Sequence, residues 1–596
     1  MPAHGDESPS FIHLWARLKD HKVAQWTLAY GAFAYALLHG ATLLSDALEW
    51  PHVIVRVLAL LLLMALPIIP ILAWHHGVRA LRRISGSKLI VITLLLLIGG
   101  SFMWLYPRAP AERAAPALVS KVTPPAARAS APFAPPAHSI AVLPFVNMSG
   151  DAKQEYFSDG ISEELLNSLS RLNDLQVVAR TSSFSFKGQS VDVPTIARKL
   201  NVGAILEGSV RQAGNTVRIT VQLINTVSGF HMWSQTYDRK LTDILKVQAE
   251  VAFMVAQQLE AKLVGDEAAR LALGGTKNAD AYGAYLRAME LNHKVDPKEA
   301  DYRQTLAALD EAISLDPNFA MAHARRASTL DAIYFSTSDT FARAGLNEQA
   351  RLAAERAVAI APQLGEAHHA LAITYTRGAP DLTQASREFY RSLALAPGSA
   401  WVQGNTGWFA CWLGRFDFAV AAMRRAVTLD PENVRLRAEM IMVLIYSRRY
   451  SEAQAAVQEA QTLAPNSHDI EARMTQILIA SGRFEQARKA CESRSTPLDE
   501  DDRHYCLALA YHALSRQADA ERELELFKAT DGDAASYFYA EIYAQFGNKA
   551  SALHWLNQAE QLHDAALVEL RVDPLLDPFR TEPRFVAIEG RLNFPL

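Results

Sequence analysis

The sequence predicts a chain of several domains: transmembrane helices at the N-terminus, a mixed α/β domain behind them, and an all-α repeat solenoid in the second half. Three observations predict this order. Long apolar segments are confined to the first 106 of the 596 residues, strand-like and helix-like patterns alternate over residues 138–265, and a helix–turn–helix pattern then recurs about every 34 residues. A chain of this length is also too long for one hydrophobic core.

Three apolar segments lie at residues 23–44, 53–74 and 89–106. Each is long enough to cross a bilayer as a helix, which needs roughly 20 residues. The third segment, "LIVITLLLLIGGSFMWLY", contains no charged residue. Tryptophans stand near the segment ends, where membrane interfaces favour them: Trp26, Trp50, Trp74 and Trp104. We therefore expect three transmembrane helices within residues 23–106.

Lys and Arg are unevenly distributed around these segments. Arg17, Lys19 and Lys22 precede the first segment, and the loop "HHGVRALRRISGSK" has four basic residues and no acid. The intervening loop, "SDALEWPH", has two acids and no Lys or Arg. The positive-inside rule then places residues 1–22 in the cytoplasm and everything after residue 106 in the periplasm, across a bacterial inner membrane. If the first segment is instead a surface helix, the topology reverses.

Residues 107–137 are rich in proline and alanine, with 8 Pro and 11 Ala among 31 residues. Such a composition cannot build a core and favours extended polyproline II, so we interpret this stretch as a semi-rigid linker. Recognition of the prolines by a partner is the alternative, and two isolated P-x-x-P matches are its only basis.

Residues 138–265 mix the two periodicities. The expected strands are residues 139–145, 176–180, 204–211, 216–224 and 231–237, and the expected helices are residues 159–172, 193–201 and 241–263. Gly214 and Asn215 stand between two strands as a hairpin signal. The order β-α-β-α-β-β-β-α predicts a compact α/β domain with a mixed sheet.

The first strand of this domain leads through a loop to a helix start, "VLPFVNMSGDAKQEYFSDGISEELL", which is also the geometry of a phosphate-binding site. Here Asp159 is placed to cap the free N–H groups itself, and Glu163 and Glu164 follow, where they would repel a phosphate. The loop also lacks the glycines and the lysine of a P-loop. We therefore expect a structural cap at Asp159 and no phosphate site.

The stretches "SIAVLPFVNMSGD", "YFSDGISEELLNSLSRL", "VVARTSSFSFKG" and "VGAILEGSVRQAGNTVRITVQLINTVSGFHMWSQTYDR" resemble the bacterial TolB-N-terminal-like (FlgO-like) domain. The resemblance covers nearly all of residues 139–263. That domain commonly precedes tetratricopeptide repeats, in proteins often labelled adenylate-cyclase-associated or transcriptional regulators. The N-terminal stretch "LWARLKDHKVAQWTLAYGAFAYALLHGA" also resembles the three-helix membrane unit of such proteins. The resemblance implies a non-catalytic module with a role in assembly. The sequence shows neither a cyclase catalytic domain nor a winged-helix domain, so neither activity is carried over.

The second half repeats a helix–turn–helix unit. Motifs similar to Leu-x-Pro close successive copies and end at Pro317, Pro362, Pro397, Pro431 and Pro465, with spacings of 45, 35, 34 and 34 residues. A period of 34 is typical of the tetratricopeptide repeat. The longer step implies an insertion of about eleven residues around residues 335–344. We expect seven to eight repeats over residues 280–567 and a C-terminal tail at residues 568–596.

A solenoid of this kind has a concave face, formed by the first helix of each repeat, that normally takes a peptide or a partner helix. Candidate partner-binding residues recur at helical spacing in two successive first helices: Trp401, Trp408, Trp412, Arg435 and Tyr446. The alternative for each tryptophan is a place in the core between repeats.

The remaining observations concern charge and chemistry. The formal net charge is −4 and the charges are spread out, which argues against a nucleic-acid partner. Cys491 and Cys506 flank the acidic run "DEDD", and in the periplasm they would either form a disulfide or be buried as small hydrophobic residues. No catalytic, cofactor-binding or metal-binding motif stands in a suitable context, and no cofactor is expected.

The sequence therefore predicts a non-enzymatic scaffold or sensor, anchored in the inner membrane, that binds protein partners through the repeat groove and the α/β domain. The alternative is a component of a cyclase-linked or transcription-linked signalling system that acts through a partner's output domain.

Overall fold

The computed structural model describes Leu37 and residues 133–595, apart from residues 173, 260–272, 293–296, 338–339 and 494. The chain divides into two compact units, Met1–Ala127 and Arg128–Leu596. The three predicted transmembrane segments, and the linker as far as residue 132, lie outside the described residues. Among the helices that are described, none combines the length and the apolar character needed to cross a bilayer.

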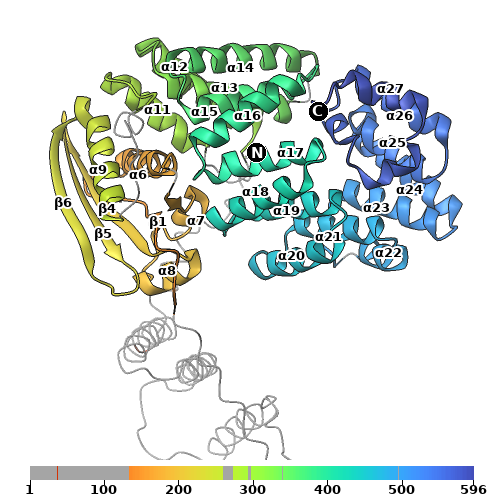
Figure 1. Ribbon diagram of the computed structural model, residues 1–596, viewed down its shortest axis with the longest axis horizontal. Coiled ribbons are helices and arrows are strands. Elements are labelled where there is room, and N and C mark those ends of the chain that lie inside the picture. Colours follow the sequence, from red (N-terminus) through yellow and green to blue (C-terminus); the bar gives the residue numbers. More distant parts are fainter. Residues whose placement is uncertain are drawn as a thin grey trace, which may run out of the picture. The chain divides into compact units, whose positions relative to one another are not determined.

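A mixed sheet of six strands forms the centre of the α/β domain (Figure 1). Its order is β3-β1-β4-β5-β6, and the short β2 pairs with β4. β1 pairs in parallel with β3 and β4, whereas β4, β5 and β6 are antiparallel. The strands are β1 (Ser139–Val142), β2 (Val146–Asn147), β3 (Gln176–Val177), β4 (Ala204–Ala213), β5 (Thr216–Asn225) and β6 (His231–Lys240). The helices are α6 (Glu155–Ser170), α7 (Arg180–Phe184), α8 (Val193–Leu200) and α9 (Ile244–Gln258).

Helices cover both faces of the sheet at β1 but only one face at β5. In β1, Ile140 and Val142 belong to the core shared with α6 and α9, while Ala141 belongs to the core shared with α8, so every residue of the strand is buried. In β5 the apolar residues are buried and alternate with polar ones such as Arg218. The alternation of apolar and polar residues in the sequence of β5 therefore indicates that one face of the sheet is exposed to solvent at this strand. A mixed α/β domain was predicted, and the structure confirms it.

The predicted cap at Asp159 is wrong, because α6 begins four residues earlier, at Glu155. A 3-10 turn, η1 (Ala152–Gln154), leads into the helix, and the side chain of Asp151 accepts a backbone N–H at its start. Asp159 therefore lies in the second turn, where its carboxylate pairs with Lys187 at 2.5 Å. Burial raises the pKa of Asp159.

An all-α solenoid follows, and its described residues contain eight helix pairs. The first helices of the pairs are α11 (Ala279–Asn292), α13 (Ala320–Ser336), α15 (Gly365–Thr374), α17 (Ala400–Trp412), α19 (Val434–Tyr446), α21 (His468–Ala480), α23 (Glu500–Ala513) and α25 (Ser536–Gln545). The second helices are α12 (Glu299–Leu315), α14 (Thr340–Ile360), α16 (Leu382–Leu395), α18 (Phe416–Leu429), α20 (Tyr450–Leu463), α22 (Phe484–Glu492), α24 (Gln517–Asp531) and α26 (Lys549–Gln561).

Short polar residues define where these helices start. The side chains of Ser399, Asn433 and Ser467 each accept a backbone N–H at the start of α17, α19 and α21. They stand at corresponding positions of successive repeats. Because each helix start needs such a cap, the 34-residue period is visible in the sequence. The insertion predicted near residues 335–344 lengthens two helices: α13 has 17 residues and α14 has 21, against 13 in α17 and 14 in α18.

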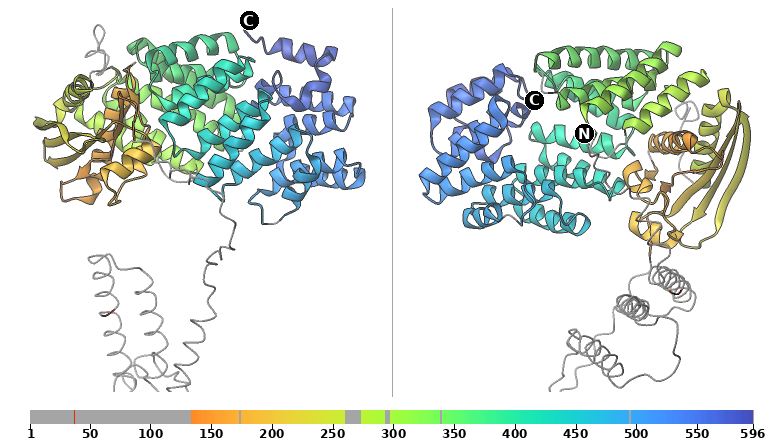
Figure 2. Two further views of the ribbon diagram at one scale, coloured as in Figure 1. Left: turned by 60° about the horizontal axis from the view of Figure 1, so that its bottom comes forward. Right: turned by 180° about the vertical axis from the view of Figure 1, so that it is seen from behind.

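The C-terminal residues fold back onto the solenoid (Figure 2). Two 3-10 helices and one α-helix form this tail: η4 (Ala565–Glu569), η5 (Pro574–Phe579) and α27 (Pro583–Arg591). Val568 and Phe585 of the tail share one buried core with Phe389 and Trp412 of the third and fourth helix pairs. The solenoid therefore curves far enough for its C-terminal end to contact its earlier repeats.

Candidate binding surface on the inner face of the solenoid

The first helices of neighbouring repeats pack against each other, as α19 does on α17 and on α21. They therefore form the inner, concave side of the curve, here called the inner face. Two segments of the chain itself lie on this face, one near its beginning and one near its end, so only part of it is open to a partner.

Helix α6 of the α/β domain occupies the beginning of the inner face. The hydroxyl of Tyr285 on α11 donates to the Glu164 carboxylate at 3.1 Å, and the buried guanidinium of Arg171 pairs with Glu366 on α15 at 3.1 Å. Burial raises the pKa of Glu164 to about 7. The α/β domain is therefore docked on the solenoid by buried groups of its own, Glu164 and Arg171, one of which pairs with the partly exposed Glu366.

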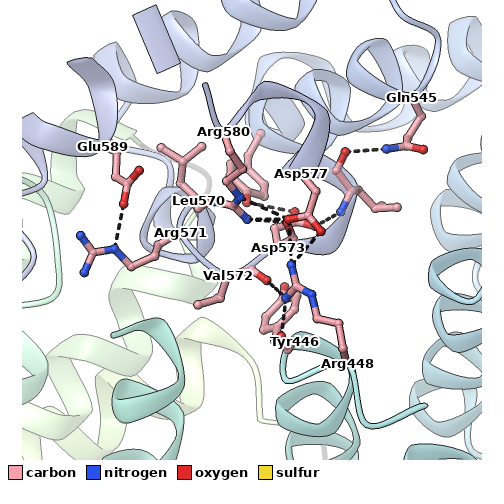
Figure 3. A network of polar contacts seen from close by, with 12 residues as sticks. Tyr446, Arg448, Gln545, Leu570, Arg571, Val572, Asp573, Asp577, Arg580 and Glu589 are labelled. Atoms are coloured by element: carbon pink, nitrogen blue, oxygen red, sulfur yellow. Dashed lines mark hydrogen bonds and ion pairs between the residues drawn. The ribbon is translucent and has the colours of Figure 1, made fainter. Parts of the chain in front are cut away.

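The tail occupies the end of the inner face, and Figure 3 shows its polar contacts with Arg448, which follows α19. The hydroxyl of Tyr446 donates to the Glu569 carboxylate. Just after α19, the guanidinium of Arg448 donates to both carboxylate oxygens of Asp577, at 2.8 and 3.0 Å, and to the Val572 carbonyl. The end of α19 and the residues just after it thus bind three separate groups of the tail.

Helix α25 binds the tail from the other side. The hydroxyl of Tyr537 donates to the Asp573 carboxylate at 3.0 Å, and the side-chain amide of Gln545 donates to the Leu575 carbonyl at 2.5 Å. Because the tail is tied to α19 and to α25 at once, it spans the concavity between them.

A pocket of about 600 Å³ remains open beside the tail. This inner pocket is lined by α19, α21, α23 and α25, by Trp408 of α17, by Phe527 of α24 and by the tail. Its aromatic lining residues are Trp408, Tyr446, Tyr505, Phe527 and Phe538. Its charged lining residues are Arg435, Glu439, Asp469, Arg473, Asp501, Asp502, Glu541, Glu569 and Asp573.

The five candidate partner-binding residues fall into three environments. Trp408, Arg435 and Tyr446 line the inner pocket, and the rings of Trp408 and Tyr446 stack with their centres 5.8 Å apart. Trp412 lies in the core that the tail completes. Trp401 is 48% exposed, and the Arg435 guanidinium lies 5.8 Å from its ring centre. The structure thus brings four of the five together on or beside one pocket.

These residues stand one repeat apart, at equivalent positions of successive first helices. Trp401 on α17 is followed by Arg435 on α19 and Asp469 on α21, and Trp408 is followed by Met442 and Gln476. Asp469, Met442 and Gln476 all line the pocket but were not among the candidates. The 34-residue period applied to Trp401 and Trp408 would have found them.

Three carboxyl groups from α25 and the tail lie on the tail side of the pocket. Burial raises the pKa of Glu541 well above its usual range, and the neighbouring Asp573 carboxylate adds to this effect. Burial also raises the pKa of Glu569 to about 7. The hydroxyl of Tyr505 donates to Glu541. Burial and the neighbouring Asp573 therefore both favour the neutral form of the Glu541 carboxyl group.

Asp501 and Asp502 of α23 also line the pocket. Asp501 and Asp502 make no hydrogen bond or ion pair within the described part of the chain, although burial raises the pKa of Asp502 to about 6. Arg435 is already paired with Glu439 at 3.0 Å. Arg473 is left as the one guanidinium of the lining that pairs with no acid of the described residues within ion-pair distance. The pocket therefore carries an excess of negative charge.

Two parts of the chain match known sequence families. Residues 136–253 match the family described as "HilA/YgeH-like transcriptional regulator, second domain". Residues 444–510 match the tetratricopeptide repeat family. The sequence is also 40% identical over 193 residues to "Putative adenylate cyclase 3" of Rhizobium meliloti (strain 1021). That alignment covers 32% of this chain and 32% of the relative, so the chain spans about a third of the curated relative that it matches.

Some solved helical repeat proteins show a partial structural likeness to this chain. A tetratricopeptide repeat protein from Parabacteroides merdae is 12% identical, covers 45% of this chain and 98% of its own, and has a TM-score of 0.34. Yeast Tom70 is 13% identical, covers 59% of this chain and 83% of its own, and has a TM-score of 0.33. The second half of the chain is a tetratricopeptide-like solenoid, and it follows a mixed α/β domain.

Proposed function

We propose that this protein is a non-catalytic scaffold or sensor, anchored in the bacterial inner membrane, that binds a segment of a protein partner in the inner pocket. The observation that carries the proposal is the pocket itself. It is a hollow of about 600 Å³ on the inner face, beside the tail. In repeat proteins this face usually binds peptides. On this account the α/β domain is a TolB-like (FlgO-like) module that fixes the solenoid in one orientation.

Two observations support a periplasmic position for the residues after 106. The basic residues cluster on one side of the predicted transmembrane segments. In addition, Cys491 and Cys506 form a disulfide, a bond that persists in oxidising compartments. Alkaline phosphatase fused after Leu596 should be active in intact cells, and a fluorescent protein fused there should be dark. The reverse pattern would place the solenoid in the cytoplasm.

Filling the pocket should abolish partner binding. Gln476 lines the pocket, whereas Gln458 is exposed on the second helix α20 and does not. We expect Gln476→Trp to lose the proteins that co-purify with the full chain from its own cells, and Gln458→Trp to retain them. If both variants retain the co-purifying proteins equally, the pocket is not the partner-binding site.

The alternative is a component of a signalling system, linked to a cyclase or to transcription, that acts through a partner's output domain. The matches to the HilA-like domain and to "Putative adenylate cyclase 3" favour it. The same co-purification discriminates between the two, because the alternative requires a pocket-dependent partner with a cyclase or DNA-binding domain. Formation of cyclic AMP from ATP by the purified full chain would instead make the protein an enzyme.

A further inference from the structure

We propose that the inner pocket recognises a positively charged side chain, Lys or Arg, presented by an extended segment of the partner protein. This inference rests on the proposed function and adds the chemistry of the occupant. It is argued from the charge of the pocket, from its aromatic lining and from its size.

The charge of the lining is unbalanced. Besides Glu541 and Glu569, which accept hydrogen bonds from tyrosine hydroxyls, five carboxyl groups face two guanidinium groups. One of the two guanidinium groups, that of Arg435, is already paired with Glu439 at 3.0 Å. Asp501 and Asp502 have no hydrogen-bonding or ion-pair partner in the described residues. Carboxylates of this kind are stabilised when a cation enters the pocket, so the pocket favours a cation and disfavours an anion.

The aromatic lining suits the same occupant. A guanidinium or ammonium group is attracted to the face of an aromatic ring within about 6 Å. The chain itself shows this contact at the edge of the pocket, where Arg435 lies over Trp401 at 5.8 Å. Inside the pocket, Trp408, Tyr505 and Phe538 offer further ring surface beside the acids. A cationic side chain would therefore meet both carboxylates and rings.

The size of the pocket favours a chain segment over a free ion. A volume of about 600 Å³ is typical of sites that bury a whole organic ligand and exceeds what one side chain fills. The pocket is lined by several first helices in succession, which is the surface that holds extended peptides in such repeats. We therefore assign the occupant as a basic peptide segment.

The test measures binding of three fluorescein-labelled peptides of equal length to the purified full chain by fluorescence anisotropy. The peptides alternate Gly and Ser and differ only at their central positions, which are Arg, its uncharged isostere citrulline, or Glu. We expect the Arg peptide to bind at least about tenfold more tightly than the citrulline peptide, and binding to weaken as salt is raised.

The matched variants separate local from overall charge. The pocket variant combines Asp469→Asn, Asp501→Asn and Asp502→Asn. The control variant combines Asp417→Asn, Glu459→Gln and Glu525→Gln, three exposed acids that do not line the pocket, and it changes the net charge equally. The preference for Arg should vanish in the pocket variant and persist in the control variant.

Two results would overturn the inference. Equal affinity for the Arg and citrulline peptides, at a site blocked by Gln476→Trp, would contradict it while leaving the proposed function intact. Failure of all three peptides to bind would also contradict it, and the proposed function would then be decided by the co-purification with Gln476→Trp. A loss of the Arg preference in both charge variants would show that only overall charge matters, which overturns the inference as well.

Discussion

Ser182 and Asp430 lie 248 residues apart in the chain, yet both the hydroxyl and the backbone N–H of Ser182 donate to Asp430 Oδ1, at 2.6 and 3.1 Å. Ser182 belongs to α7 of the α/β domain, and Asp430 ends α18 of the solenoid. Both residues are buried. The α/β domain is thus bonded to an inter-repeat turn, and the two domains form one body.

Replacing Asp430 by alanine should loosen this junction. The change leaves the buried hydroxyl and N–H of Ser182 without their acceptor, which costs about 2 kcal/mol. Hydrogen exchange in α7 of the full chain should then accelerate by roughly 30-fold, since local opening becomes easier by that amount. Asp417→Ala, at a side chain that is 95% exposed, should leave exchange in α7 unchanged. Unchanged exchange in the Asp430 variant would mean that the bond does not hold the domains together.

Gly398 is a second point where the two domains meet. Its N–H donates to the Ser170 carbonyl at 3.1 Å, and a Cβ atom at this position would lie 2.6 Å from that same oxygen. Gly398→Ala should therefore force the backbones apart and destabilise the chain by about 1–3 kcal/mol. Gly345→Ala, where a Cβ atom meets open space on α14, should be neutral or slightly stabilising. Thermal unfolding of both variants, followed by tryptophan fluorescence, measures the difference, and equal midpoints would contradict it.

The disulfide predicts a redox-dependent stability. Cys491 and Cys506 are 15 residues apart, and closing a loop of this length stabilises a chain by about 3 kcal/mol. Cys491→Ser combined with Cys506→Ser should lower the urea midpoint of the purified chain, and a reducing agent should lower the wild-type midpoint to a similar value. The reducing agent should not affect the double variant. Should it shift the variant as far as the wild type, the effect would come from another source.

The tail should be less stably held as the pH rises. Burial raises the pKa of Glu569 from 4.5 to about 7, so the folded chain keeps a proton that the unfolded chain releases between these values. This stability is fully present below about pH 4.5 and is lost as the pH rises through about 7, with a slope near 1.4 kcal/mol per pH unit for one group. Glu569→Gln keeps an acceptor for Tyr446 but cannot titrate.

The measurement is the free energy of unfolding of wild type and Glu569→Gln between about pH 4.5 and 8. The two curves should diverge up to about pH 7 in favour of the variant and then run parallel. Glu459→Gln, at an exposed position, should follow the wild type throughout. Parallel curves for Glu569→Gln over the whole range would show that this carboxyl group is ionised in the folded chain.

Much of the fold could be predicted because local patterns determine it. The alternation in β5 reports one solvated face, and the 34-residue period reports caps and packing positions that recur in each repeat. Helix α7 could not be predicted, because its five residues carry no apolar period and its buried Ser182 is bonded to Asp430, far along the chain. The start of α6 was misplaced because Asp159 has the side chain of a helix cap, whereas Asp151 caps the 3-10 turn η1 and α6 begins directly after it.

The candidate site was predicted only in part. Periodicity places Trp408 and Trp412 on the same helix, but it does not reveal what lies against each ring. The tail reaches the inner face because small rotations between repeats accumulate over the solenoid, and no local pattern encodes their sum. Trp412 is therefore buried in a core that also contains tail residues such as Leu567, while Trp408 stays at the open pocket.

The most direct test of the central claim, that the inner pocket holds a partner segment, is site-specific photo-crosslinking in living cells. Phe538 lines the pocket and is 37% exposed, whereas Phe418, which is 39% exposed, lies on the second helix α18 away from it. A benzophenone amino acid replaces one phenylalanine at a time in the full chain. We predict a discrete protein adduct from position 538 that disappears when Gln476→Trp is added, and none from position 418. Adducts of equal yield from both positions, or none from position 538, would contradict the claim.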